Sequence, residues 1–301
     1  MLLIVLVAVV LAGLLAAKGF SGGAPTRPAA AAAEGGLVAL QLRPGQALRT
    51  VAVNVDTIEW PGLEPAAGGG FIGSQRPTRG LVQYREHLGQ WFAYDGAIRT
   101  AFHPASAPQF IGSTIAHSAW NIDFRAHRQA WLTGLGSGPF VGGQGFFFGP
   151  RRVSYRNLLN LPTDPGLLVR AIRGAAAPAG ADPITVVAGL LTEPLPAAER
   201  AAVIRAAELL PGVRYLPSVH DPLGRPGAAL ATEGTNAPGS RHGWRIQVEY
   251  VFNPRTYALL AYGSTLVSRT DVQGVTPGFH LDWRAYISSK IVPRSDVPRL
   301  P

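Results

Sequence analysis

The sequence predicts an α+β fold in which an antiparallel β-sheet is packed by helices on one face. Three observations support this prediction. The chain contains 36 glycines and 26 prolines, which favours turns and short elements over a helix bundle. Residues 163–210 contain segments with helical apolar faces, whereas residues 244–252 alternate apolar and polar side chains like a strand with one solvated face. We therefore expect a helical insert within a β-rich body.

The first twenty residues contain a run of sixteen apolar side chains, Leu2–Ala17, which ends at Lys18. This length lies between a signal-peptide core and the about 20 residues that a helix needs to cross a bilayer. We expect residues 1–20 to form a single-pass membrane anchor, with cleavage and secretion as the alternative. Both interpretations place the main domain outside the cytoplasm.

The flanks of this apolar run bear on its interpretation. No basic side chain precedes it, whereas Lys18 and Arg27 follow it, against the positive-inside trend. This pattern is consistent with a start codon further upstream. Residues 21–36 are rich in Ala, Gly and Pro and are predicted to be a linker, so a buried core helix before them is the least favoured reading. Residues 37–301 are predicted to form one extracytoplasmic domain.

The N-terminal half of the domain is predicted to be mostly antiparallel. Residues 37–42 and 50–55 are aliphatic and β-branched and are predicted as strands, although the Ala-containing first segment would also suit a helix. Residues 81–84 and 90–94 are predicted as short strands. Asp95-Gly96 is a residue pair typical of a type I′ hairpin turn.

A glycine-rich segment spans residues 134–150. It has neither the G-x-G-x-x-G spacing of a dinucleotide site nor the Gly-Lys-Ser/Thr of a phosphate loop. We interpret it as a connection that buries its four phenylalanines, Phe140, Phe146, Phe147 and Phe148.

Three helices are predicted in the insert. Asp164 and Pro165, which follow Pro162, cap the first helix, and Gly174 is expected to end it. Asp182-Pro183 begins the second helix in the same way. The third runs from Pro196 to about Leu210 and ends at Pro211-Gly212.

The insert closes with a predicted turn, residues 221–227, in which Asp221, Gly224 and Arg225 are expected to be structural, with a recognition role as the alternative. Strands are expected on both sides of this turn. The alternating strand that follows places four apolar side chains on one face: Ile246, Val248, Tyr250 and Phe252.

The formal charge of +9 does not by itself indicate nucleic-acid binding, because the basic residues are dispersed. The nearest approach to a sequence patch is Arg151-Arg152 with Arg156. We therefore expect no nucleic-acid partner. The absence of cysteine excludes disulfides, thiolate nucleophiles and Cys-ligated metal centres.

Catalytic motifs are not evident. The seven histidines have no H-x-x-x-H spacing, and a cluster of His117, Asp123 and His127 would require the chain to fold back. A G-x-S-x-G match occurs only at residues 19–23, beside the apolar run, where no strand-to-helix turn is expected. We expect no metal, no cofactor and no enzymatic activity.

Four segments carry a family resemblance. They are LPTDPGLLVRAIR (161–173), PAAERAAVIRAAELLPGVRYL (196–216), DPLGRPGAAL (221–230) and VFNPRTYALL (251–260). In this order they resemble an actinobacterial family of uncharacterised membrane-anchored extracytoplasmic proteins with LPTDP, LPGV and D-x-x-GR-x-G motifs. The family's D-P-x-T-G turn appears here as residues 253–257, with Tyr257 in place of glycine.

The resemblance implies a curved sheet similar to the half-open β-barrels of lipoprotein carriers. Such a face could hold a lipid-like ligand or an envelope protein, and the weak candidates for contact with it are Phe146, Phe148, Ile246, Val248, Tyr250 and Phe252. A hydrolase assembled from sequence-distant His, Asp and Ser residues and a purely structural envelope protein are the alternatives.

Overall fold

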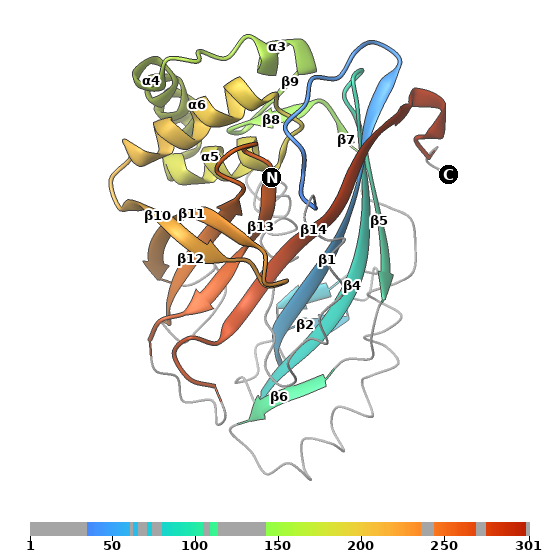
Figure 1. The fold of residues 1–301 in the computed structure, drawn as a ribbon. Helices are drawn as coiled ribbons and strands as arrows, with labels where there is room; N and C mark the ends of the chain where they lie inside the picture. Colours follow the sequence, from blue (N-terminus) through green and yellow to red (C-terminus); the bar gives the residue numbers. More distant parts are fainter. Residues whose placement is uncertain are drawn as a thin grey trace.

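A computed structural model describes residues 35–60, 63–65, 71–73, 80–104, 109–113, 143–235, 244–268 and 275–298 (Figure 1). The predicted anchor and nearly all of the linker lie outside these residues. So do Phe140, His117, Asp123 and His127.

The fold is dominated by one antiparallel sheet, as predicted. Its strands follow the order β10-β11-β12-β13-β14-β1-β4-β5-β7, and β6 also pairs with β4. Among the described strands β10 pairs only with β11, and the sheet is not closed into a barrel. The strands are β1 Gln46–Trp60, β4 Gly80–Ala93, β5 Ala97–Pro104, β6 Gln109–Ser113, β7 Gly143–Gln144, β10 Val213–His220, β11 Pro226–Thr235, β12 Arg245–Phe252, β13 Leu259–Leu266 and β14 His280–Pro293.

Two small hairpins accompany the main sheet. β2 Leu63–Pro65 pairs with β3 Phe71–Gly73, and β8 Phe146–Phe148 pairs with β9 Arg151–Val153. The second hairpin leads directly into the helices.

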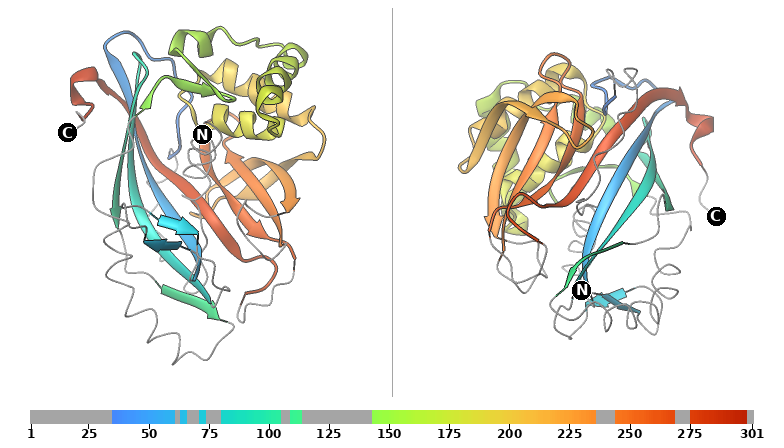
Figure 2. Two further views of the ribbon diagram at one scale, coloured as in Figure 1. Left: turned by 180° about the vertical axis from the view of Figure 1, so that it is seen from behind. Right: turned by 60° about the horizontal axis from the view of Figure 1, so that its bottom comes forward.

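The helices lie together at one end of the molecule (Figures 1 and 2). They are α3 Tyr155–Leu159, α4 Pro165–Ala176, α5 Pro183–Thr192 and α6 Ala197–Glu208, with 3-10 turns at Ala177–Ala179 and Arg294–Asp296. Asp164 and Asp182 are the N-caps of α4 and α5, as predicted, because their side chains accept hydrogen bonds from Leu167 N (2.7 Å) and Ile184 N (3.0 Å).

The sheet has two different faces. Alternate residues of its strands, among them Leu48, Leu230 and Tyr286, pack with helix residues such as Ile172 and Leu190 in the main core. We call this the helix-side face. The intervening residues form the opposite face, where a second apolar cluster contains Val53, Val55, Val251, Trp283 and Ala285.

Several predicted elements differ in detail. α4 continues through Gly174 to Ala176, because a single glycine is tolerated within a helix whose flanking alanines favour it. The two short strands at 81–84 and 90–94 form one strand, β4.

The predicted hairpin after β4 is present, but its turn is not type I′. Of the turn residues only Gly96 has a positive φ (88°), and Asp95 instead accepts a hydrogen bond from Ala97 N. A type I′ turn needs positive φ at both central positions.

Residues 37–42 form no continuous strand. Leu37 makes a single bridge to Leu259, and Leu42 N donates to the Tyr155 hydroxyl (3.0 Å) instead of to a neighbouring strand. Side chains of the helical layer thus satisfy this segment's backbone.

Candidate functional site

A single row of residues crosses seven strands on the helix-side face. Direct cross-strand pairing joins each member to the next, from the edge strand β10 to β4. We call it the central row: Tyr215, Leu230, Tyr250, Tyr262, Arg284, Asn54 and Glu86.

The first half of the central row is apolar and aromatic. The rings of Tyr250 and Tyr262 stack with centroids 6.0 Å apart, and Tyr286 lies 6.5 Å from Tyr262. Tyr250 and Tyr286 are buried, whereas Tyr262 is only half-buried. The aromatic surface of the row therefore reaches the edge of the helix-covered core.

The second half of the row is polar and buried. Arg284 Nε donates to Asn54 Oδ1 (2.6 Å), and the guanidinium lies 5.5 Å from the centre of the Tyr262 ring. Arg284, Asn54 and Glu86 are each at most 6% exposed. Arg284 Nη1 also lies 3.5 Å from Gln90 Oε1, so the guanidinium links several polar side chains of this face.

The electrostatics of this end are governed by burial. Burial raises the pKa of Glu86 above its ordinary value, although the Asn54 amide and the Arg284 charge act in the opposite direction. Burial also raises the pKa of Tyr250 and Tyr286, and Tyr262 adds to both effects. The row thus contains one cation and one carboxyl group whose pKa burial raises above its ordinary value.

The six side chains predicted as weak ligand contacts divide into two groups. Phe146, Tyr250 and Phe252 are buried in the main core. Phe148, Ile246 and Val248 are half-buried. Because Ile246 and Val248 lie on β12 on the same face as Tyr250, they continue the apolar surface beyond it.

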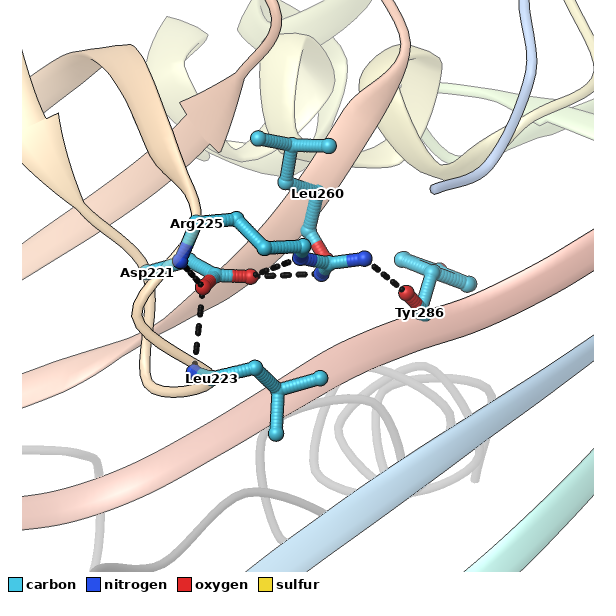
Figure 3. A network of polar contacts seen from close by, with 5 residues as sticks. All are labelled: Asp221, Leu223, Arg225, Leu260 and Tyr286. Atoms are coloured by element: carbon cyan, nitrogen blue, oxygen red, sulfur yellow. Dashed lines mark hydrogen bonds and ion pairs between the residues drawn. The ribbon is translucent and has the colours of Figure 1, made fainter. Parts of the chain in front are cut away.

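The Asp221 turn is a closed structural unit (Figure 3). Asp221 Oδ1 accepts from the backbone N–H groups of Leu223 (3.0 Å) and Arg225 (2.8 Å), and Asp221 Oδ2 pairs with the Arg225 guanidinium. The same guanidinium donates to the carbonyls of Tyr286 (2.8 Å) and Leu260 (2.9 Å), and Gly224 has a φ of 78°. These bonds engage the side chains of the motif within the fold.

The other structural residues of the sequence motifs lie around the helices. Pro165 occupies the first turn of α4, and Pro162 lies just before it, at the end of the loop after α3. Pro211 and Gly212 form the turn between α6 and β10, and Gly212 has a φ of 78°.

Another buried arginine, Arg200 on α6, was not predicted. It is 0% exposed and donates to the carbonyls of Leu37 (2.5 Å) and Glu193 (2.7 Å), with a longer contact to Tyr257 O (3.4 Å). Tyr155 acts nearby by donating to Pro194 O (2.8 Å). Together they fix the segment that enters the fold at Gly35.

The histidines provide no assembled catalytic group within the described residues. His87 of β4 is directly paired with His103 of β5, His220 lies at the end of β10, and His280 Nδ1 lies 3.1 Å from Thr265 Oγ1. The same part of the chain contains no group of three His, Asp or Glu side chains placed to hold a metal ion. Nor does it contain a helix with the length and apolar character needed to span a bilayer.

The central row was missed because its members are far apart in sequence. One local signal was available, since Asn54 interrupts the otherwise apolar and β-branched segment Thr50–Val55. A buried amide in a strand generally needs a polar partner on a neighbouring strand. Naming that partner required the register of β1 with β14.

Comparisons with protein-family models, with curated proteins and with solved structures found no significant match to the chain. The family resemblance therefore stays a prediction from the four sequence motifs.

Proposed function

We propose that this protein is a non-catalytic binding module, tethered to a membrane by its N-terminal residues, that holds an amphipathic ligand on the helix-side face. The ligand's apolar body would lie along Ile246, Val248 and Tyr262, and its polar end would point toward Arg284. In this proposal the open sheet has the curvature of a half-open barrel, similar to that of the lipoprotein carriers.

One observation carries the proposal. On a single sheet face, apolar side chains that are fully packed under the helices give way to the half-buried Ile246, Val248 and Tyr262, and Tyr262 adjoins the buried guanidinium of Arg284. Such a combination suits a molecule with a hydrocarbon part and a hydrogen-bonding or anionic end.

Two features favour binding over catalysis. Arg284 and Glu86, the charged residues of the central row, are each directly paired with Asn54 across neighbouring strands. Arg284 also donates a hydrogen bond to the Asn54 side chain. The described histidines lie on four different strands, β4, β5, β10 and β14.

The test is native mass spectrometry of the full chain, purified in a mild detergent from a membrane-containing host. We expect an adduct of lipid-like mass on the wild type. Val248→Arg should lose the adduct, because a cation would replace apolar surface in the ligand stripe, by which we mean Ile246, Val248 and Tyr262. Leu167→Arg is the matched control, since Leu167 is 48% exposed on α4, and it should retain the adduct.

A protein partner is the alternative outcome. A wild type without adduct, in a preparation where a weakly held lipid is retained by a reference carrier, would contradict the ligand proposal. Association with an envelope protein that Val248→Arg abolishes would then assign the same stripe to a protein contact.

A further inference from the structure

The opposite face of the sheet carries a second cross-strand row, which is basic and aromatic. Direct pairing places Arg99 of β5 beside Trp91 of β4, Trp91 beside Arg49 of β1, and Arg49 beside Lys290 of β14. We call these four residues the basic row. These residues lie up to 241 positions apart in the sequence, so they form no cluster of basic residues along the chain.

The basic row is partly open to solvent. Lys290 is exposed, Arg49 and Trp91 are half-buried, and Arg99 is 9% exposed behind them. The Arg49 guanidinium lies 5.6 Å from the centre of the Trp91 ring, so the arginine is held over the indole. The row thus offers two accessible cations around an amphipathic ring.

No acid is directly paired with Arg49 or with its neighbours on this face of β1, β4 and β14. In the pairing rows through Ala47, Arg49, Val51 and Val53 of β1, the directly paired residues of β4 and β14 include no Asp or Glu. Asp95, in the turn after β4, is already paired with Arg294 (2.7 Å). An anionic partner would therefore meet cations around Arg49 and Lys290, whereas the acids of this face, Glu233 and Glu249, lie on β11 and β12.

The surroundings of the row favour a membrane surface over a nucleic acid. Ile287, the extra residue where β14 shifts register against β1, is 42% exposed, and the neighbouring Val51 is half-buried. Exposed aliphatic and indole groups among cations suit the headgroup region of a bilayer. Nucleic-acid-binding surfaces instead need a denser cluster of Lys and Arg side chains.

We propose that the basic row docks on anionic phospholipid headgroups, with Arg49 and Lys290 as the phosphate contacts and Trp91 at the interface. This docking face is separate from the ligand stripe, which lies on the helix-side face. The orientation of the domain on the membrane would then be set by the row as well as by the tether.

The test uses the fact that the chain has only two lysines, Lys18 and Lys290. The full chain is reconstituted into vesicles of phosphatidylglycerol and phosphatidylcholine or of phosphatidylcholine alone. The rate at which a water-soluble amine reagent modifies Lys290 is measured by mass spectrometry. We expect at least about fivefold slower modification in the anionic vesicles, since each basic side chain near such a surface contributes roughly that factor, and about 0.5 M salt should remove the protection.

A matched pair of variants separates the row from overall charge. Arg49→Glu should abolish the protection of Lys290, whereas Arg170→Glu, which makes the same charge change at an exposed position of α4, should retain it. Circular dichroism checks that both variants are folded. The Lys290 readout does not depend on the bound ligand, so loss of the adduct described above leaves it unchanged.

Three outcomes would overturn the proposal. Equal protection in vesicles of phosphatidylcholine alone would assign it to the fold or to self-association. Equal loss of Lys290 protection in Arg49→Glu and Arg170→Glu would show that the protection depends only on net charge. Protection by a single-stranded oligonucleotide but not by anionic vesicles would assign the basic row to a nucleic acid.

Discussion

Arg200 and Arg225 are both buried, and both lie beside the segment that enters the fold at residues 35–37, but they have different partners. Arg225 pairs with the Asp221 carboxylate in addition to two carbonyls. Arg200 bonds only to carbonyls, and no described carboxylate pairs with it. Burial lowers the pKa of Arg200 to about 10, so it still carries its charge near neutral pH.

The different partners of Arg200 and Arg225 show how each buried charge is stabilised. At Arg225 a second ion compensates the first, and the pair must be kept intact. At Arg200 the aligned dipoles of backbone carbonyls take the place of an anion. Glu193 belongs to the same region, yet its side chain is not the partner of Arg200. Only its backbone oxygen is.

The largest expected effect follows from breaking the ion pair. Arg225→Met should lower the free energy of unfolding by about 3–5 kcal/mol, because it leaves the buried Asp221 carboxylate without its cation. Urea unfolding measures this change. Asp221→Asn combined with Arg225→Met should recover part of the loss, since asparagine can still accept the bonds from Leu223 N and Arg225 N.

An exposed pair serves as the control for that variant. Arg214 is 53% exposed and pairs with Glu233 at 3.1 Å. Arg214→Met should cost about 0–1 kcal/mol. Similar losses for Arg214→Met and Arg225→Met would show that burial does not distinguish the two pairs.

The second effect depends on pH and lies in the Arg200 region. Burial raises the pKa of Glu193 to about 8, with the Phe147 N–H and the Arg152 charge opposing the shift. Because the folded-state pKa of Glu193 lies above the unfolded value, the stability that this side chain contributes is fully present below about pH 4.5. It is lost as the pH rises through about 8. Glu193→Gln mimics the neutral acid and should remove this loss. Its free energy of unfolding, relative to that of the wild type, should be higher at pH 9 than at pH 4 by on the order of 2–4 kcal/mol.

Urea unfolding at pH 4, 7 and 9 measures the difference between the two proteins. Glu208→Gln is the control, since it makes the same side-chain change at an exposed position near the end of α6. A flat difference for Glu193→Gln would show that a compensating cation reaches the carboxylate.

Local sequence rules predicted the helical region well and the arginine sites poorly, for a physical reason. The Asp-Pro caps at 164–165 and 182–183 act within three residues, so the sequence alone identified them. The Asp221 turn was recognisable because Asp221 and Arg225 are four residues apart. The partners of Arg200, by contrast, lie up to 163 residues away, and the members of both cross-strand rows meet only through the register of the long strands.

The third expected effect tests whether carbonyls stabilise Arg200 less than a carboxylate stabilises Arg225. Arg200→Met should cost about 1–3 kcal/mol, because it leaves neutral carbonyls with fewer donors but also removes an unpaired buried charge. Urea unfolding beside Arg225→Met gives the comparison. A larger loss of unfolding free energy for Arg200→Met than for Arg225→Met would reverse this ranking. The contact of Arg200 with Leu37 would then be the main interaction that holds the entering segment.

The smallest expected effect concerns Tyr257, whose carbonyl is the most distant acceptor of Arg200. It is the one non-glycine among the described residues with a positive φ (56°). A left-handed conformation costs an L-residue roughly 1–2 kcal/mol, and glycine avoids that cost. Tyr257→Gly and Tyr257→Ala both remove the ring, so their difference isolates the backbone. We expect glycine to be more stable than alanine by about 1 kcal/mol in thermal or urea unfolding, and equal stabilities would mean that the turn relaxes out of the left-handed region when the ring is lost.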